Sequence, residues 1–572
     1  MPGILHPSVP VSPTNSASGI QDQKQETNTG TPKIFDWLPP PSARTPLILD
    51  AWTKVLAGHP NPEEVNFVLH TIQHGACINF EGDRDIGSCA PNLASTKSDP
   101  AFIDQYIHEE IKAGRMFGPF DVPPFPNFRA SPVGLVPKDS SGWRLINHLS
   151  FGGDMAINHS IAKMECKLGS FDEAVDLIHK VGRGAKLIKL DVKAAFRLVP
   201  VRTEDLHLLG LNWNGKYYVD AALPFGLSSS PPIWERFSRL LRWCLIHVAG
   251  CNHTMHYVDD FLIVVPPSDD AEACMERALD LMQRLGVPVS SKKLVGPTCR
   301  LEYLGHELNT TDLTCQVALE KKMQALKIIE STLAKTWITR VELQSVLGRL
   351  FFLTRILPQG RAFLGRGIAL LRGKQKKSRY RVTAGFVDDL KWWQHHLPIW
   401  PGVALAFKSE WESASFLSLY TDASEKGAGA FFNGSWFSHK WTEAELALAK
   451  RRKRLSLPFL ELLAVGHAVS TWAHLLSGKR VCLFSDNQCA VHALNYLKNK
   501  DERLLALVRQ IISLCLEWQF VLRLQYIASL NNVLADPLSR LDIDLFQERC
   551  PHADQDQTQL RPLPLTIGSS YE

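Results

Sequence analysis

Residues 254–265, TMHYVDDFLIVV, are the stretch from which the rest of this chain can be interpreted. They form an apolar, strand-like run that is interrupted in its middle by two adjacent carboxylates, Asp259 and Asp260. Burying such charges is costly unless a cation or hydrogen-bond donors meet them. A tight hairpin with the two acids at its turn would place Tyr257 and Phe261 on flanking strands and project the acids together. Because Asp is also an ordinary turn residue, a surface turn explains this stretch equally well when it is taken alone.

The composition is that of a globular protein with several domains. The chain has 572 residues, 45% of them hydrophobic, and this length predicts two to four domains. Its net charge of +5 permits nucleic acid as a partner without requiring it. The twelve cysteines form no CxxC pair, which argues against zinc ribbons and secreted disulfides and favours an intracellular setting, cytoplasmic or nuclear. We find no apolar run of membrane-spanning length and no signal-peptide pattern, so we expect a soluble protein without a membrane partner.

A second acid-bearing strand lies upstream. Residues 185–201, AKLIKLDVKAAFRLVPV, form a β-rich run with Asp191 at the end of LIKL and Phe196 five residues later. A strand that ends in Asp, beside a strand that carries paired Asp, is the arrangement that two Mg²⁺ ions need, since hard cations take carboxylate oxygens. Without metal, these like charges would repel one another and raise each other's pKa. The two stretches therefore explain each other as a site that activates a 3′-hydroxyl and stabilises a departing pyrophosphate.

Two more stretches suit a nucleotide. Residues 131–149 predict two strands joined by the turn DSSG, with Lys138 and Arg144 flanking the turn. Two cations at a hairpin tip usually do no more than face solvent. A triphosphate would nevertheless favour this pairing, because the Lys ammonium acts as a point charge and the planar Arg guanidinium can donate two parallel hydrogen bonds. Residues 222–237, ALPFGLSSSPPIWERF, predict a loop that opens a helix and brings backbone close to a base pair.

In this order and combination, the four stretches resemble those of the retroelement reverse transcriptases. Asp191 matches the first catalytic aspartate of that family, and YVDD at 257–260 matches its paired-aspartate box. LPFGLSSSP matches the loop that contacts the templating base and the incoming nucleotide, which implies nucleotide-binding roles for Phe225 and Gly226. Phe225 stands where retroviral enzymes carry Gln, as it does in gypsy-like elements.

The resemblance implies further roles. Phe196 is similar to the steric gate, an aromatic ring that clashes with the 2′-hydroxyl of a ribonucleotide, although a core aromatic is the alternative. Lys292 and Lys293 resemble the basic element near the triphosphate. The sequence LEYLG at 301–305 resembles the hairpin that grips the primer end, formed here by Tyr303, Leu304 and Gly305.

The flanking segments predict the domain organisation. Residues 1–45 are too poor in apolar groups to fold and predict a disordered tail, and residues 46–117 have helical spacing. Residues 118–315 would form fingers and palm, and residues 316–371 a helical thumb with Leu319, Met323, Leu326 and Leu333 on one face and a capping box from Thr339 to Glu342. Residues 372–415 predict a basic linker. Residues 416–545 would form a second catalytic domain, followed by a disordered tail at 546–572.

The second domain carries its own set of acids. Strand and helix patterns alternate from residue 416, and acids occupy element ends or a helix at Asp422, Glu461, Asp486 and Asp536. One Asp after a strand is most often a helix cap, but four acids in this order are harder to dismiss. The pattern resembles ribonuclease H, whose carboxylates hold two Mg²⁺ ions and cleave RNA in an RNA–DNA hybrid.

The sequence therefore predicts an α+β right-hand polymerase followed by an α/β ribonuclease H-like domain with a mixed five-stranded sheet. Its predicted function is that of a retrotransposon reverse transcriptase with ribonuclease H activity, of gypsy-like or DIRS type, using two Mg²⁺ ions per site with Mn²⁺ as an alternative. The expected partners are an RNA template, a DNA primer, RNA–DNA hybrids and dNTPs, with a separate recombinase or integrase and a Gag-like protein. The competing interpretation is a domesticated, catalytically inactive nucleic-acid-binding protein. An intron- or telomere-type polymerase fits YVDD but not the second set of acids.

Overall fold

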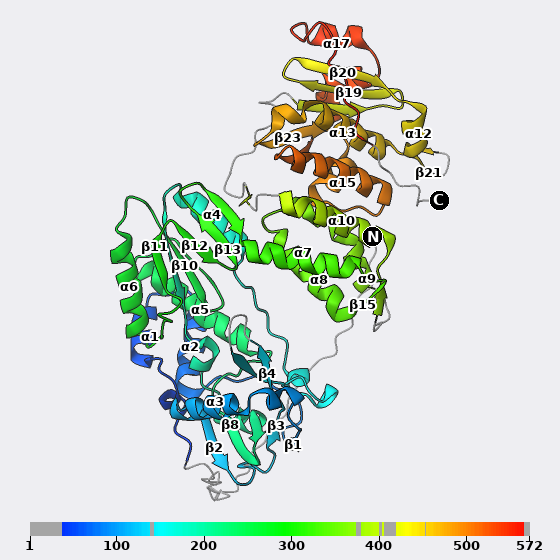
Figure 1. The fold of residues 1–572 in the computed structure, drawn as a ribbon. Helices are drawn as coiled ribbons and strands as arrows, with labels where there is room; N and C mark the ends of the chain where they lie inside the picture. Colours follow the sequence, from blue (N-terminus) through cyan, green and yellow to red (C-terminus); the bar gives the residue numbers. More distant parts are fainter. Residues whose placement is uncertain are drawn as a thin grey trace, which may run out of the picture.

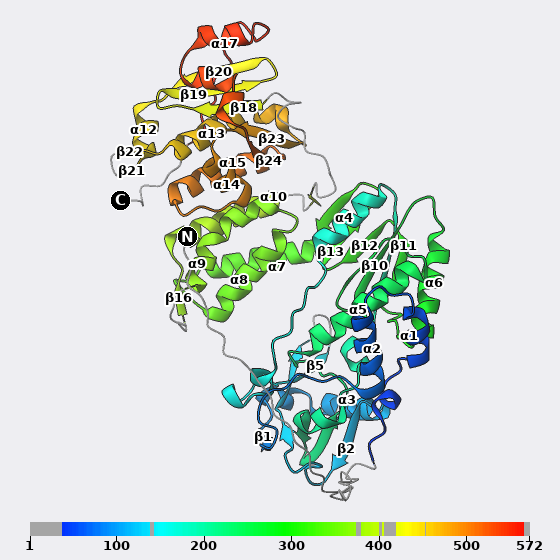
Figure 2. The same ribbon diagram turned by 180° about the vertical axis from the view of Figure 1, so that it is seen from behind.

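The protein has three parts that follow one another along the chain. The computed structural model describes residues 37–137, 142–372, 379–399, 403–404, 419–451 and 454–564. The N-terminal half forms one body, the C-terminal sheet domain forms another, and a group of helices lies between them (Figure 1). The reverse view shows the same arrangement (Figure 2).

The sheet that carries the first acids is antiparallel and buried on both faces. Its strand order is β11 (Val295–Thr298), β6 (Lys186–Asp191), β10 (Asp260–Val265) and β9 (Thr254–Tyr257). Alternate residues of β10 pack into two different cores, one with α5 (Ser230–His247) and α6 (Ala271–Arg284), the other with α4 (Phe171–Val181). Burial on both faces explains why residues 261–265 are apolar without interruption. The predicted hairpin is present, but its two-residue turn is formed by Val258 and Asp259, because Asp260 already pairs with Tyr257 as the first residue of β10.

The N-terminal part adds a second sheet and a separate hairpin. The sheet has the order β1 (Ser88–Cys89), β3 (Arg129–Ala130), β7 (Gly210–Trp213), β8 (Lys216–Asp220) and β2 (Met116–Phe120). The hairpin of β4 (Val133–Pro137) and β5 (Trp143–Asn147) confirms the two strands predicted within 131–149. Helices α1 (Leu49–Leu56), α2 (Pro62–His74) and α3 (Pro100–Lys112) occupy the segment predicted to be helical, which also contains β1 and the start of β2.

The disordered tail predicted for residues 1–45 is wrong at its end. Pro41–Arg44 form a short 3₁₀ helix, η1, and the Arg44 side chain is buried. Its Nη2 donates a hydrogen bond of 3.0 Å to the carbonyl oxygen of Val201. A single buried arginine that meets a distant carbonyl leaves no apolar pattern, so composition could not reveal it. Residues 1–36 lie outside the described part.

Helices follow the palm, as predicted for the thumb. These helices are α7 (Leu319–Leu333), α8 (Arg340–Leu353) and α9 (Gly365–Leu371). They follow the strands β12 (Arg300–Tyr303), β13 (His306–Asn309) and β14 (Thr314–Val317), whose sheet is completed by the later strand β17 (Val403–Ala404). The predicted capping box is confirmed. The Glu342 N–H donates to Thr339 Oγ1 at 3.2 Å, and the Thr339 N–H donates to Glu342 Oε2 at 2.7 Å.

The predicted apolar face of α7 is wrong in its first half. Leu319 and Met323 are 70% and 57% exposed, whereas Ala325 and Ile329 are buried. Helix α7 meets α8 and α10 (Ala384–Ile399) along the face of the small residue Ala325. The large apolar residues at its start therefore face outward.

The basic linker predicted for residues 372–415 contains a packed helix. Within α10, Trp393 is fully buried, and Trp392 Nε1 donates a hydrogen bond of 2.8 Å to Ser513 Oγ in the C-terminal domain. Strand β16 (Arg379–Arg381) pairs with β15 (Trp337–Thr339). The basic residues before α10 led to the prediction of a linker. The aromatic residues of α10 nevertheless supply enough apolar surface for this segment to pack. Residues 373–378, 400–402 and 405–418 lie outside the described part.

The C-terminal domain is built on the mixed five-stranded sheet that was predicted. Its order is β20 (Ser435–Lys440), β19 (Gly427–Phe432), β18 (Leu419–Ala423), β23 (Arg480–Ser485) and β24 (Val521–Tyr526), with parallel pairing from β18 to β24. Its helices are α12 (Glu443–Ala449), α13 (Leu457–Leu476), α14 (Gln488–Tyr496), α15 (Glu502–Glu517), α16 (Ala535–Ser539) and α17 (Ile543–Arg549). Helix α13 is long and apolar enough to cross a membrane, but 83% of its most apolar window is buried in the protein, as in the core helix of a domain.

The disordered tail predicted for residues 546–572 is also wrong where the structure describes it. Helix α17 continues to Arg549, and the segment after it follows the edge strand β20, where the Thr558 N–H donates to the Trp436 carbonyl at 2.7 Å. Leu563 is 2% exposed within the domain core. This segment covers the exposed edge of the sheet, a role that its polar composition did not indicate. Residues 565–572 lie outside the described part.

Candidate active sites

The three polymerase acids lie at one end of the palm sheet. Asp191 is the last residue of β6 and is paired in register with Asp260, the first residue of β10. The carbonyl oxygen of Asp259 accepts a hydrogen bond of 2.9 Å from the Val192 N–H. The convergence that the sequence predicted is therefore present: residues separated by almost seventy positions come together because β6 and β10 are neighbouring antiparallel strands.

The turn that presents Asp259 is held in an unusual conformation. Val258 has φ +58°, a region that β-branched residues rarely adopt. Two side chains from α5 fix this turn by donating to the Val258 carbonyl, Trp234 Nε1 at 2.9 Å and Ser238 Oγ at 2.7 Å. Sequence reasoning missed both positioning residues, because nothing in a helix pattern shows which side chain reaches a distant carbonyl.

Burial and the repulsion of neighbouring acids raise the pKa values of Asp259 and Asp260. Burial raises the pKa of Asp259 to about 6, and the negative charge of Asp260 adds to the rise. Burial also raises the pKa of Asp260, while Lys189 opposes that rise. Lys293 Nζ lies 2.6 Å from Asp191 Oδ2. Of the two predicted lysines, Lys293 therefore contacts the acids, while Lys292 is exposed beside it.

The acids fit divalent cations. Asp260 Oδ1 is buried and has no hydrogen-bond partner among the described residues, and Lys189 Nζ meets it only as an ion pair at 3.8 Å. Carboxylate oxygens gathered in a buried site are the donor set that Mg²⁺ takes. The fit rests on this unsatisfied oxygen together with the raised pKa values of Asp259 and Asp260.

The predicted nucleotide loop packs against the β4–β5 hairpin. Gly226 has φ +100°, and a Cβ atom there would lie 2.3 Å from the Asn147 carbonyl oxygen, so only glycine fits. Asn158 holds the loop on its other side, since its Nδ2 donates to the Gly226 carbonyl at 2.8 Å and its Oδ1 accepts from the Ser228 N–H at 2.9 Å. Asn158 is a third positioning residue that the sequence did not reveal.

The predicted gate and cations are placed as follows. Phe196 is half-buried with its ring centroid 5.5 Å from that of Phe225, which is 39% exposed. Arg144 is exposed on β5, the strand that also carries Asn147. Lys138 lies outside the described residues.

The predicted primer grip has one half-buried part and one fully buried part. Leu304 and Gly305, at φ +47° and +79°, form the turn between β12 and β13. Tyr303 is fully buried, and its hydroxyl donates a hydrogen bond of 3.3 Å to the Asp260 carbonyl. The Tyr303 side chain therefore supports β10 from within the core, and the primer-grip role of the turn stays a prediction.

A second acid cluster lies in the C-terminal domain. Carboxylate oxygens of Asp422 on β18, Glu461 on α13 and Asp486 after β23 all lie within 4.8 Å of one another. Asp536, on α16, is near enough for its charge to raise the pKa of Asp422, but its Oδ1 is paired with Arg540 Nε at 2.9 Å. The structure thus brings three of the four predicted acids into one cluster and places the fourth at its edge.

The electrostatics of this second cluster match those of the first. Burial raises the pKa of Asp422 to about 6, with the charges of Asp486 and Asp536 adding to it. Burial raises the pKa of Glu461 well above its usual range, and Asp422 and Asp486 act in the same direction. Glu461 Oε2 is buried without a hydrogen-bond partner among the described residues, which makes this cluster a fit for divalent cations too.

Hydroxyl and amide groups that the sequence did not indicate orient this cluster. Ser539 Oγ donates to Asp422 Oδ2 at 2.5 Å, and Ser529 Oγ donates to Asp486 Oδ2 at 2.6 Å. Asn532 Nδ2 donates to the Thr421 carbonyl at 3.0 Å and thereby holds the segment before α16 against β18.

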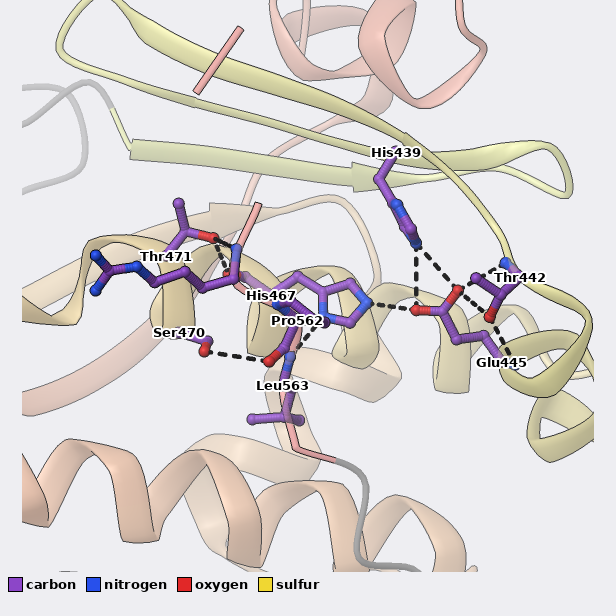
Figure 3. Close-up of polar contacts among 9 residues, drawn as sticks. His439, Thr442, Glu445, His467, Ser470, Thr471, Pro562 and Leu563 are labelled. Carbon is purple, nitrogen blue, oxygen red and sulfur yellow. Dashed lines mark hydrogen bonds and ion pairs between the residues drawn. The ribbon is translucent and has the colours of Figure 1, made fainter. Parts of the chain in front are cut away.

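His439, Glu445 and His467 form another group of possible metal ligands (Figure 3). The Nε2 atoms of His439 and His467 lie 3.0 and 2.9 Å from oxygens of Glu445. The Leu563 N–H donates to His467 Nδ1 at 3.0 Å, so the ring proton of neutral His467 is on Nε2 and points at Glu445. That proton occupies the position a metal would need. Burial opposes ionisation of Glu445, but hydrogen bonds from the two histidines and Thr442 hold its pKa well below its usual range. This group is therefore a hydrogen-bond network that ties α12, α13 and the C-terminal segment together.

Comparison with known proteins identifies the class of the first site. Residues 136–308, which contain all three polymerase acids, match the family model described as reverse transcriptase (RNA-dependent DNA polymerase). The Transposon Tf2-3 polyprotein of Schizosaccharomyces pombe is 22% identical over 377 residues, 64% of this chain and 26% of that protein. The Gag-Pol polyprotein of Rous sarcoma virus subgroup C is 24% identical over 220 residues, 36% of this chain and 12% of that protein.

The fold comparison gives a weaker likeness. A solved structure of the foamy viral protease-reverse transcriptase in complex with double-stranded DNA is 16% identical, with a TM-score of 0.48, covering 84% of this chain and 81% of that one. The chain spans about a quarter of the length of the curated transposon relatives that it matches. This protein carries a reverse transcriptase domain. Within that domain and beyond it, the chain is similar to retroelement polyproteins. Its assignment to gypsy-like or DIRS-type elements stays a prediction.

Proposed function

We propose that this chain is an RNA-directed DNA polymerase of a retrotransposon that also degrades RNA in RNA–DNA hybrids. The observation that carries the proposal is the presence of two separate buried acid clusters, one around the register pair Asp191 and Asp260, the other around Glu461. Each contains an acid oxygen without a donor, and each has raised pKa values. Two such clusters in one chain fit two phosphoryl-transfer reactions better than they fit a passive binding protein.

In the polymerase site, Asp191, Asp259 and Asp260 would hold the divalent ions that activate a primer 3′-hydroxyl and stabilise the leaving pyrophosphate. Trp234 and Ser238 fix the turn that presents Asp259. Gly226 and Asn158 shape the loop where the resemblance places the templating base and the incoming nucleotide. Phe196, beside that loop, would act on the sugar.

In the C-terminal site, Asp422, Glu461 and Asp486 would hold the ions that activate water for attack on an RNA phosphodiester. Asp536 joins them when its pairing with Arg540 opens. The two activities are complementary, because copying RNA leaves a heteroduplex whose RNA strand must be removed before a second DNA strand is made. The proposed partners are therefore an RNA template, a DNA primer and the RNA–DNA hybrid that copying produces.

Two assays on one set of purified variants test this proposal. Primer extension on an RNA template and cleavage of a labelled RNA–DNA hybrid are measured with Mg²⁺ for the parent chain, Asp259→Asn and Glu461→Gln. Asp259→Asn should abolish extension and leave cleavage, and Glu461→Gln should do the reverse. Asp280→Asn, at an exposed position on α6, is the matched control and should change neither. A parent chain that binds hybrid but catalyses neither reaction would instead establish the inactive binding protein.

A further inference from the structure

Two buried cysteines face each other behind the palm sheet, away from the acids. The Sγ atoms of Cys251 and Cys274 lie 3.3 Å apart, and the residues are 1% and 4% exposed. Cys251 belongs to the loop between α5 and β9, and Cys274 lies in the first turn of α6. The two side chains already point at one another, so a bond between them requires little rearrangement.

A pocket lies beside the cysteine pair, and both residues form part of its wall. The pocket has a volume of about 300 Å³, and its wall includes Cys251, Cys274, Asn252, Asp270, Val265 and Arg277. This space allows one end of a small disulfide to reach the thiols without unfolding of the core.

The surroundings of Cys274 favour its thiolate. The hydrogen bond shared with Cys251 lowers the pKa of Cys274 to about 7, and Arg277 acts in the same direction. The position of Cys274 in the first turn of α6 places it at the positive end of the helix dipole. The same hydrogen bond raises the pKa of Cys251, so Cys274 is the nucleophile of the pair and Cys251 is the thiol that responds second.

We propose that Cys251 and Cys274 form a reversible dithiol switch, a modification site for small organic disulfides. The Cys274 thiolate attacks one sulfur of the disulfide, whose S–S bond breaks, and the first leaving thiolate takes up a proton. Cys251 then loses its proton and attacks the Cys274 sulfur, which releases the second small thiol. The two protein thiols lose two electrons, and the small disulfide becomes two thiols.

The bond would tie α6 to the catalytic hairpin. The Cys251 carbonyl accepts a hydrogen bond of 2.7 Å from Thr254 Oγ1, and Thr254 is the first residue of β9, the strand that leads to Asp259. Linking Cys251 to Cys274 therefore fixes the start of that strand against α6. In intracellular proteins, disulfides of this kind are typically transient and respond to redox conditions.

The test uses the native full chain with 2-hydroxyethyl disulfide as the probe. After acid quenching, peptide mapping by mass spectrometry should find one cross-link, between Cys251 and Cys274, with the loss of two hydrogens and full reversal by dithiothreitol. Cys251→Ser should stop at a mixed disulfide on Cys274, whereas Cys274→Ser should leave Cys251 unmodified. Cys244→Ser is the matched control, because burial raises the pKa of Cys244 to about 12, and it should not alter the cross-link.

Three results would overturn the proposal. The first is a native chain in which both cysteines stay free while the exposed Cys89, Cys166 and Cys489 carry adducts. The second is a link that forms only in denaturant. The third is a Cys251→Ser variant that gains no adduct on Cys274. Because the readout is the bond itself, none of these results depends on the activity of either acid cluster. The linked form should also have a higher thermal midpoint than the reduced form, since the bond constrains the unfolded chain.

Discussion

Asp191 and Asp260 are direct cross-strand partners, and the ammonium group of Lys293 lies 2.6 Å from the Asp191 carboxylate. Like charges placed opposite each other on a sheet repel, so this lysine stabilises the pair. Its charge also lowers the pKa values of Asp259 and Asp260 against the larger effect of burial.

Replacing Lys293 should move the acid limb of polymerase activity. Without its charge, the acids keep their protons to higher pH, and protons compete with the divalent ions. Lys293→Gln is therefore expected to shift the acid limb upward by about half a pH unit and to raise the Mg²⁺ concentration for half-maximal activity near pH 6. Lys292→Gln, at the exposed neighbour, is the control. An equal shift in both variants would mean that general surface charge, and not contact with Asp191, sets the limb.

Two buried glutamates of the C-terminal domain should respond to amide substitution in opposite directions. The pKa of Glu461 is raised in the folded state, so its ionised form destabilises the fold as pH rises above its unfolded pKa. Without metal at pH 8, Glu461→Gln should therefore stabilise the domain by about 1–2 kcal/mol, and this gain should vanish near pH 4. Denaturant unfolding in EDTA at the two pH values measures it, and excess Mg²⁺ should cancel it.

The pKa of Glu445 is lowered in the folded state. Its ionised form therefore stabilises the domain at pH values above the unfolded pKa, and this stabilisation is lost as the pH falls. Glu445→Gln should cost about 2–3 kcal/mol at pH 8, because an amide cannot accept from His439, His467 and Thr442 together. If Glu461→Gln and Glu445→Gln destabilised the domain equally, the prediction would be wrong. The contrast between Glu461, whose Oε2 has no hydrogen-bond donor among the described residues, and Glu445, which accepts several hydrogen bonds, would then not determine stability.

Phe196 should control sugar selection. If its ring excludes the 2′-hydroxyl, Phe196→Ala should raise the efficiency of ribonucleotide incorporation, relative to deoxyribonucleotide incorporation, by about tenfold or more. A tenfold change in this ratio corresponds to about 1.4 kcal/mol. Phe225→Ala removes the neighbouring ring, 5.5 Å away, and should weaken nucleotide binding without changing the sugar ratio. Single-nucleotide incorporation kinetics with both sugars separate the two effects. An unchanged ratio in Phe196→Ala would leave Phe196 as a core aromatic.

The acid-bearing strands could be predicted from local patterns, and the resemblance to reverse transcriptases and ribonuclease H implied the fold and the grouping of the acids. Asp191 and Asp260 end or begin apolar strands, and strands of this kind pair within one sheet. The positioning groups could not be predicted, because Ser238, Asn158 and Ser539 are ordinary polar residues whose partners lie elsewhere in the chain. Their roles depend on tertiary distances that sequence spacing does not contain.

The errors have a related cause. Helix α7 was expected to bury its largest apolar residues, but packing against α8 and α10 selects the small Ala325, and Leu319 faces outward. The C-terminal residues were expected to be disordered because few of them are apolar. One of those few, Leu563, is buried, and a neighbouring backbone group pairs with the edge strand. The composition of a segment is an average over all its residues, whereas the attachment of that segment to the rest of the fold depends on single residues.

The docking of Leu563 gives the last prediction. Its side chain lies against Gly466, where a Cβ atom would approach Leu563 Cδ2 to 2.6 Å, and its N–H is bonded to His467 Nδ1. Leu563→Ala should therefore destabilise the C-terminal domain by about 2–3 kcal/mol through the cavity it leaves. Leu560→Ala, at a partly buried neighbour, should cost about 1 kcal/mol or less. Protonation of His467 removes the acceptor for the Leu563 N–H, and burial lowers the pKa of His467, so the difference between parent and Leu563→Ala should shrink only as the pH falls below the ordinary range of histidine. Unfolding of the two variants and the parent at pH 8 and pH 5 measures this, and a pH-independent difference would show that the apolar contact holds the segment without help from His467.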